Sequence, residues 1–277
     1  MTAPERGSSR GGGRWHPAHP DFPWWLAALG LLAIGFGAFI AAEAGLRQTI
    51  AILSTGLVTT VKVTVFAFSG ALVLGFLVAL AGRSRRRLPR NLARFYVELV
   101  RGVPVLVLLF WIAFAGVPVF VAGWNGLAAP LRDAGLVSEL LVRDVSLLMR
   151  GVIALVIAYS AFIAEIVRAG LDAVPKGQTE AAQALGLKPF QRLRLVVLPQ
   201  AIRTVLPPLG NDLVAMVKDS SLVSVLGVAD ITQMGKVYAS GSFRFFETYS
   251  LVAYLYLLMT VSLSLAARAL ERHLSRR

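Results

Sequence analysis

Long apolar segments alternate with short charged ones along this chain of 277 residues. Each long apolar segment can cross a hydrocarbon core of about 30 Å as a helix that rises about 1.5 Å per residue. No segment shows the sustained alternation of apolar and polar residues that is typical of membrane β-strands. The pattern therefore predicts an all-α, polytopic membrane helix bundle with six transmembrane helices, at residues 24–43, 57–82, 103–123, 148–170, 202–227 and 247–268.

Composition agrees with a membrane protein and excludes several other classes. Hydrophobic residues make up 56% of the chain, whereas soluble domains have about 45–50%. The net charge of +13 does not indicate nucleic-acid binding, because the basic residues lie between apolar segments and not on one soluble face. The chain has no cysteine, and its three histidines lie near the termini. We therefore expect no disulfide, no metal site within the spans and no cofactor in this chain.

The distribution of Lys and Arg predicts the orientation in the membrane, because these residues are retained on the cytoplasmic side. If the N-terminus is cytoplasmic, the inner segments hold 20 of the 28 basic residues and the outer segments hold six. The other two, Lys62 and Lys218, fall within spans. This asymmetry predicts a multi-pass protein of a bacterial cytoplasmic membrane with both termini in the cytoplasm.

The N-terminal region divides into a tail and a first span. Residues 1–23 are rich in Gly, Ser, Pro and Arg, which predicts a disordered cytoplasmic tail. Residues 24–43 could imitate a signal peptide, since Ala42-Glu43-Ala44 resembles a cleavage site. Because the apolar run exceeds the usual ~7–15 residues of a signal peptide, we expect an additional, retained transmembrane helix ahead of a permease-like domain at residues 50–270.

One connecting segment, residues 171–201, carries a motif with fixed spacing: Glu180-Ala181-Ala182, three residues, Gly186, nine residues, Val196, one residue and Leu198-Pro199. The residues before Gly186 are good helix formers, and Gly186 can end a helix in the left-handed conformation. Lys188-Pro189 prevents the helix from continuing directly. The segment therefore predicts a helix–turn–helix outside the spans.

This spacing resembles the cytoplasmic EAA loop of ABC importer permeases, in which Ile occupies the position of Val196. Further similarity to permeases for polar amino acids extends over roughly residues 50–265, with Arg101-Gly102-Val103-Pro104 and Lys218-Asp219-Ser220-Ser221 as examples. The resemblance implies a five-helix core of the type I ABC importer kind. It also implies that residues 171–201 form the coupling helix docking into an ATPase, with contacts from Glu180, Ala181, Ala182, Gly186, Leu198 and Pro199.

The resemblance implies partners on both sides of the membrane. The only Gly-Lys pair, Gly235-Lys236, lacks the surrounding residues of a phosphate-binding loop. ATP and Mg²⁺ would therefore bind a separate ABC ATPase subunit, and this chain would be a non-catalytic translocation subunit. A substrate-binding protein would deliver the amino acid, and a second permease subunit, identical or different, would complete the passage. Membrane lipid would surround the spans.

Charged residues within the spans indicate where a substrate passes, because each costs at least about 2.5–3.5 kcal/mol on insertion scales. At 100° per residue, one half of the fifth predicted span carries five polar residues: Asn211, Asp212, Lys218, Asp219 and Ser221. They either line the passage, with Lys218 and Asp219 compensating the two charges of a zwitterion, or hold neighbouring helices together. Glu165 either pairs locally with Arg168 or contacts the substrate, and Arg101 is a candidate gate or subunit contact.

The favoured function is import of a polar or charged amino acid as an ABC permease subunit. A permease for another small solute is the alternative. An ion-coupled secondary transporter is a further alternative, but it predicts paired broken helices and internal repeats, which this sequence lacks. A structural scaffold would leave the polar half of the fifth span unexplained.

Overall fold

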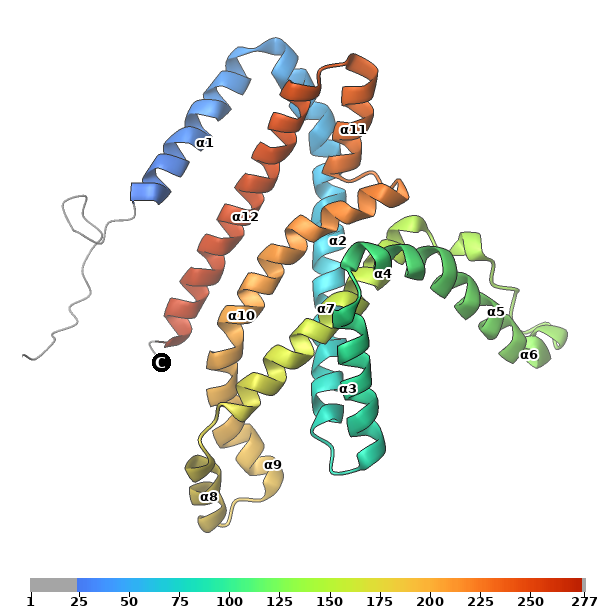
Figure 1. Ribbon diagram of the computed structural model, residues 1–277, viewed down its shortest axis with the longest axis vertical. Coiled ribbons are helices and arrows are strands. Elements are labelled where there is room, and N and C mark those ends of the chain that lie inside the picture. Colours follow the sequence, from blue (N-terminus) through green and yellow to red (C-terminus); the bar gives the residue numbers. More distant parts are fainter. Residues whose placement is uncertain (1–23, 276–277) are drawn as a thin grey trace, which may run out of the picture. The chain divides into compact units, whose positions relative to one another are not determined.

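The computed structural model describes residues 24–275. The predicted disordered tail, residues 1–23, lies outside these described residues. All regular structure in the described part is helical, which confirms the all-α prediction (Figure 1). The α-helices are α1 Trp24–Ala42, α2 Ala44–Gly82, α3 Arg87–Gly102, α4 Val105–Trp111, α5 Val117–Leu127, α6 Ala129–Asp133, α7 Leu147–Asp172, α8 Lys176–Ala184, α9 Pro189–Arg192, α10 Leu198–Asp219, α11 Ile231–Ser242 and α12 Phe245–Ser275. Two π-helices (Ile112–Gly116 and Leu193–Val197) and two 3₁₀ helices (Val142–Asp144 and Ser220–Leu226) lie between them.

Five helical stretches are long and apolar enough to cross a membrane, in rough agreement with the six predicted spans. They are Trp24–Ala42, Ala44–Gly82, Val105–Leu127, Leu147–Asp172 and Phe245–His273. The remaining predicted span, residues 202–227, corresponds to α10 and the following 3₁₀ helix. This stretch is more polar, since α10 contains four charged residues as well as Pro207 and Pro208.

The chain divides into two compact units, residues 1–47 and 48–277. The first contains α1, whose Leu31, Leu32 and Ile34 are all more than 70% exposed, as expected of side chains that face lipid. Helix α2 begins in this unit and continues through the second. Its 39 residues span about 58 Å, so it is longer than the predicted span 57–82, which covers only its most apolar part.

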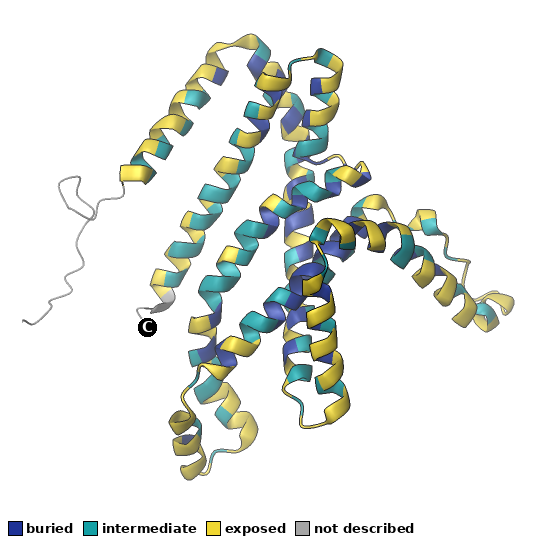
Figure 2. Cartoon of the chain, viewed as in Figure 1, coloured by how far each residue is buried: buried dark blue, intermediate teal, exposed yellow. Residues whose placement is uncertain are grey.

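Helix α7 is the central helix of residues 48–277. In its most apolar window 61% of the residues are buried, against 33% in α2 and 11% in α12. Its Leu155 and Ile163 are fully buried in a core that also includes Val63 of α2, Leu109 of α4 and Met216 of α10 (Figure 2). Close packing of α2 on α7 requires Gly75, because a Cβ there would lie 2.8 Å from the Ser160 carbonyl oxygen.

The segment 83–102, expected only as a connection, forms the helix α3. It ends at Gly102 because Val103, which precedes Pro104, is held in an extended conformation. One face of α3 packs on α7 through Val97 and Ala164, and α2 contributes Ala79 to the same contact. The packing of α3 positions Arg101 beside the charged residues Glu165 and Arg168 of α7.

Candidate functional site: the coupling loop and the charged helices

The motif segment forms the predicted helix–turn–helix at one end of the second unit (Figure 1). Helix α8 ends where Gly186 takes a φ of +77°. The Leu187 N–H donates to the Ala182 carbonyl at 3.1 Å, and the Gly186 N–H donates to the Gln183 carbonyl at 2.9 Å. These two bonds are the Schellman arrangement, in which a left-handed glycine satisfies the last carbonyls of a helix.

The turn after Gly186 is fixed by side chains as well as by backbone. Helix α9 begins at Pro189, and the Gln191 side chain accepts a hydrogen bond of 2.9 Å from the Lys188 N–H. Arg192 of α9 donates to the Gln183 side chain of α8 at 2.7 Å. Leu198 and Pro199 form the first turn of α10, which follows the π-helix Leu193–Val197 without a break. The loop is therefore a defined surface that leads directly into α10.

The surface of the loop is suited to a protein contact. Glu180, Ala181 and Gly186 are exposed, and Ala182 is buried within the chain. Only the first alanine of the pair is thus available to a partner, whereas the sequence suggested that both would be. Leu185 and Phe190 are 81% and 71% exposed. The loop therefore presents exposed apolar area as well as the exposed carboxylate of Glu180.

The polar residues of the fifth predicted span lie beside different neighbouring helices. Regular α10 ends at Asp219, and Ser221 lies in the 3₁₀ helix, so one helical projection does not describe all five residues. The Asp219 carboxylate accepts a hydrogen bond of 2.8 Å from the Tyr159 hydroxyl of α7. Asn211 instead lines a cavity of about 310 Å³ together with Arg268 and Glu271 of α12.

Asp212 and Lys218 form no ion pair within residues 24–275, and Lys218 is exposed. One carboxylate oxygen of Asp212, Oδ2, is buried and has no hydrogen-bond partner there. An unpaired buried carboxylate oxygen is costly. A cationic group that reaches Asp212 would therefore gain a strong partner.

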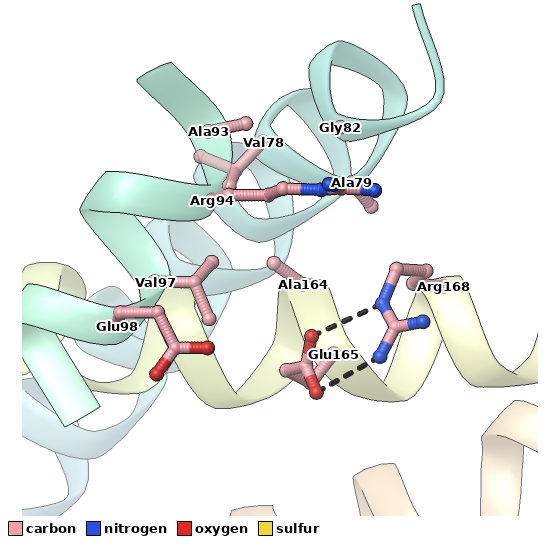
Figure 3. A pocket seen from close by; sticks show the side chains of 10 residues that line it. All are labelled: Val78, Ala79, Gly82, Ala93, Arg94, Val97, Glu98, Ala164, Glu165 and Arg168. Carbon is pink, nitrogen blue, oxygen red and sulfur yellow. Dashed lines mark hydrogen bonds and ion pairs between the residues drawn. The ribbon is translucent and has the colours of Figure 1, made fainter. Parts of the chain in front are cut away.

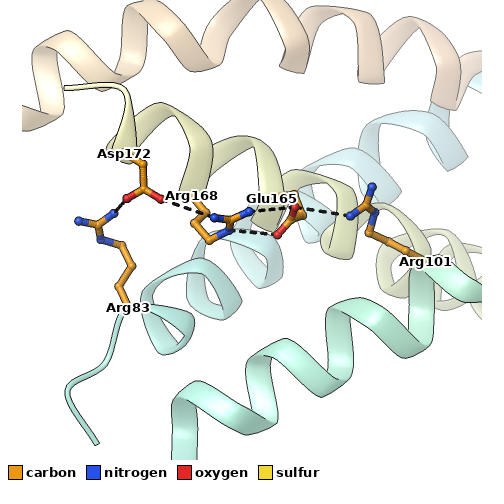
Figure 4. Close-up of polar contacts among 5 residues, drawn as sticks. All are labelled: Arg83, Arg101, Glu165, Arg168 and Asp172. Carbon is orange, nitrogen blue, oxygen red and sulfur yellow. Dashed lines mark hydrogen bonds and ion pairs between the residues drawn. The ribbon is translucent and has the colours of Figure 1, made fainter. Parts of the chain in front are cut away.

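A chain of charges joins α2, α7 and α3 (Figure 4). Arg83 contacts Asp172, and Asp172 lies 3.5 Å from Arg168. Arg168 binds both carboxylate oxygens of Glu165 at 3.1 Å, so the expected local pair is present. Glu165 also lies 3.5 Å from Arg101, whose guanidinium sits 5.6 Å from the Phe162 ring centroid. The structure thus connects Arg101 to Glu165, a contact that the sequence did not predict.

Two further polar residues are important, and sequence reasoning missed both. Buried Arg150 donates to the carbonyls of Val145, Ala113 and Val142, at 2.9, 3.0 and 2.5 Å. Its sequence signal is weak, because an arginine near the end of a span usually extends to the membrane surface.

Asp230 is the second missed residue. It is fully buried, caps α11 by accepting from the Gln233 N–H at 2.8 Å, and accepts from the Tyr256 hydroxyl at 3.1 Å. Burial raises the pKa of this carboxyl, and the hydrogen bonds to Gln233 and Tyr256 oppose the rise. An acid three residues ahead of Gln at a helix start is a capping signal that the sequence did contain.

Metal binding has no support in the described part of the chain. There, no three His, Cys, Asp or Glu side chains gather closely enough to hold an ion.

Comparison with known proteins gives consistent matches over most of the chain. Residues 71–277 match the family described as the binding-protein-dependent transport system inner membrane component. The glutamine transport system permease protein GlnP of Escherichia coli K12 is 34% identical over 225 residues, covering 81% of this chain and 94% of that protein. The probable amino-acid permease protein YxeN of Bacillus subtilis is 33% identical over 217 residues, and the match covers 78% of this chain and 88% of that protein.

Solved structures agree. A crystal structure of an amino acid ABC transporter with histidines has a TM-score of 0.69 and 34% identity, and the match covers 83% of this chain and 97% of that chain. An inward-facing structure of the MetNI methionine ABC transporter has a TM-score of 0.63 at 21% identity, and the match covers 82% of this chain and 98% of that chain. At this identity, the match supports the fold alone.

Proposed function

Because this chain belongs to the family of binding-protein-dependent transport system inner membrane components, we propose that it is the permease subunit of an ATP-driven importer for a polar or charged amino acid. It is a multi-pass membrane protein, and its relatives are amino-acid permeases. The observation that carries the proposal is the capped turn α8–Gly186–α9, an exposed surface outside the spans that leads into both α7 and α10.

The proposed division of labour places ATP hydrolysis on a separate subunit. That ATPase holds ATP and Mg²⁺ and contacts Glu180, Ala181 and Gly186, with the exposed Leu185 and Phe190 completing the interface. Leu198 and Pro199 transmit its movement into α10. A second permease subunit, of the same or a sister kind, and a substrate-binding protein complete the importer. The basic residues of α3 and of the coupling loop orient both ends of the chain toward the cytoplasm.

The proposed passage runs along the contact between α7 and α10. Asp219, held by Tyr159, and the unpaired Asp212 offer negative charge to an ammonium group, and Lys218 offers a cation to a carboxylate. Ser221 adds an uncharged hydrogen-bonding group, and Asn211, which lines the cavity beside α12, is not assigned to this passage. A ligand with both charges suits this set, since each charge compensates the desolvation of the other.

The coupling surface is tested by the substitution Gly186→Arg in vesicles that contain the ATPase, with the binding protein and labelled amino acid outside. An arginine here strains the backbone, because φ is +77°, and its side chain projects from the docking surface. We expect uptake to fall at least tenfold while the permease still inserts. Gly135→Arg is the matched control, because Gly135 also has a positive φ, +72°, and open space around it.

Equal loss of uptake in the two variants would mean that backbone strain, and not docking, causes the effect. Normal uptake by Gly186→Arg would refute the coupling assignment.

The passage is tested separately with Asp219→Asn and Lys218→Met, which should lower uptake more than the yield of the complex with the ATPase. A parallel fall of yield and uptake would make these residues structural.

A further inference from the structure

Helix α3 has two apolar faces, and only one of them is buried. Ala93, Val97 and Val100 are buried on one side, where the helix packs on α2 and α7. Four large side chains on another side of the helix are between 54% and 72% exposed: Leu88, Leu92, Phe95 and Leu99. Their spacing of four, three and four residues places them along one line of the helix surface. Helix α3 therefore presents an apolar stripe, about three turns long, to its surroundings.

The start of α3 and the turn before it concentrate unpaired positive charge. Five arginines lie between residues 85 and 94, and residues 83–97 contain no Asp or Glu. Within residues 24–275, none of the five forms an ion pair or a side-chain hydrogen bond: Arg85, Arg86, Arg87, Arg90 and Arg94. Their neighbour Arg83, by contrast, pairs with Asp172. No side chain caps the first turn of α3, so the N–H groups of that turn also favour an anion.

Arg94 lies two turns from the start of α3, beside a cavity of about 420 Å³ between α2, α3 and α7. Its side chain extends away from Glu98 and across the cavity that it shares with Gly82, the last residue of α2 (Figure 3). On the α7 side of this cavity, Glu165 and Arg168 neutralise each other through two hydrogen bonds of 3.1 Å. The guanidinium of Arg94 is therefore available to an anion together with the other four arginines.

The arrangement of the arginines and the apolar stripe suits a phospholipid with an anionic headgroup. At 100° per residue, Arg87, Arg90 and Arg94 occupy one strip of α3, and Asn91 lies between this strip and the apolar stripe. A phosphate can lie on the arginines while the acyl chains lie along the stripe. A free phosphate would leave the apolar stripe uncovered. A second copy of this chain, packed face to face about a two-fold axis, would bring the same arginines together and be repelled.

We propose that the turn between α2 and α3 binds an anionic phospholipid, whose phosphate contacts the arginines of residues 85–90 and whose acyl chains lie along the apolar stripe. Clusters of basic residues at the cytoplasmic end of a membrane helix attract anionic lipids, and each such residue near the surface changes binding about fivefold. The choice of the cytoplasmic leaflet rests on the proposed orientation of the chain, whereas the binding rests on the unpaired arginines and the stripe. The bound lipid holds this turn, which Arg83 links to Asp172 of α7, at the membrane surface.

The test uses the full-length chain in detergent micelles, with a bimane fluorophore attached through Asn91→Cys. Asn91 is exposed, and the natural chain has no cysteine, so the label is confined to this position. Phosphatidylglycerol, which is anionic, or phosphatidylcholine, which is zwitterionic, is titrated into the micelles. Both lipids carry nitroxide-labelled acyl chains, which quench the fluorophore on contact. We expect phosphatidylglycerol to reach half-maximal quenching at a mole fraction at least tenfold lower than phosphatidylcholine does.

Two double variants locate the binding. Arg87→Gln combined with Arg90→Gln should raise the midpoint for phosphatidylglycerol at least fivefold and leave the midpoint for phosphatidylcholine unchanged. Arg132→Gln combined with Arg143→Gln is the matched control, because both arginines are exposed and lie outside α3. The control should give the midpoints of the natural chain for both lipids.

Equal midpoints for the two lipids in the natural chain, or an equal shift in the two double variants, would overturn the proposal. Quenching by phosphatidylglycerol that millimolar inorganic phosphate abolishes at constant ionic strength would also overturn it, because the site would then recognise a free anion. Neither an ATPase nor a substrate takes part in this experiment. A failure of import would therefore refute the proposed function and leave the lipid site unaffected.

Discussion

Arg150 should fix the N-terminal end of α7 against the π-helix Ile112–Gly116, and its removal should cost measurable stability. Its guanidinium reaches the carbonyls of Val145 and Val142, and also that of Ala113 in the π-helix Ile112–Gly116. The Ala113 carbonyl needs this donor. The Val117 N–H already donates to the Ile112 carbonyl, and the residue five positions after Ala113 is Pro118, which has no N–H.

The magnitude follows from these three bonds. A hydrogen bond to a charged group contributes about 1.5–3 kcal/mol, so the three together contribute roughly 5–9 kcal/mol. Arg150→Met loses these bonds but regains part of the lost free energy, because burying a guanidinium without a carboxylate costs several kcal/mol. The carbonyls of Val142 and Val145 are only partly buried and can turn toward water. We expect a net loss of about 2–4 kcal/mol, borne mainly by the fully buried Ala113.

Thermal unfolding of the purified permease measures this loss. Trp111 and Trp124 lie in the continuous helical stretch Val105–Leu127 that includes Ala113, so their fluorescence reports on it. A loss of 2–4 kcal/mol corresponds to a fall in Tm of roughly 4–16 °C. The Tm of Arg150→Lys should fall by about half as much, since one ammonium can donate to one or two of the carbonyls. Arg143→Met is the matched control, because Arg143 is exposed in the same region. The reasoning is refuted if Arg150→Met melts at the temperature of the natural chain or of Arg143→Met.

Three further predictions concern topology, packing and the passage. In this cysteine-free chain, an impermeant maleimide applied to intact cells should label Ser138→Cys and not Ser84→Cys; the reverse result means the orientation is inverted. In thermal unfolding, Gly75→Val should destabilise the α2–α7 contact by about 1–3 kcal/mol, because its Cβ would lie 2.8 Å from a backbone oxygen. The control Gly30→Val, with open space around the substituted residue, should have little effect on thermal unfolding. Tyr159→Phe removes the hydrogen bond to Asp219. Because such a bond contributes about 1.5–3 kcal/mol, uptake should fall roughly tenfold or more. Tyr249→Phe, at an exposed position, is the control, and equal uptake by both variants contradicts a role for Tyr159.

Local sequence signals predicted local structure well. The end of α8 at Gly186 depends only on residues within one turn, because the two capping bonds join residues five and three apart. Hydropathy likewise located the apolar part of each span. The same reasoning underestimated α2, since its first turns are too polar to register as a span although they remain helical.

Side-chain partners distant in sequence could not be predicted from periodicity. The Arg101–Glu165 contact joins residues 64 apart, and the Arg83–Asp172 contact joins residues 89 apart. Each depends on how α3 and the end of α2 pack on α7, which no local pattern specifies. The separation of Asn211 from Asp219 has the same origin, because α12 and α7 pack on different sides of α10.

The proposed coupling loop and the proposed passage are both connected to α7. This helix is uninterrupted over 26 residues. Its C-terminal end joins α8 through residues 173–175 and is linked to the end of α2 and to α3 by the charge chain from Arg83 to Arg101. Its middle carries Tyr159, which donates to Asp219, and its N-terminal end carries Arg150. Since a close-packed core shifts between discrete arrangements and does not deform continuously, we expect a change that breaks the charge chain to alter the Tyr159–Asp219 contact as well.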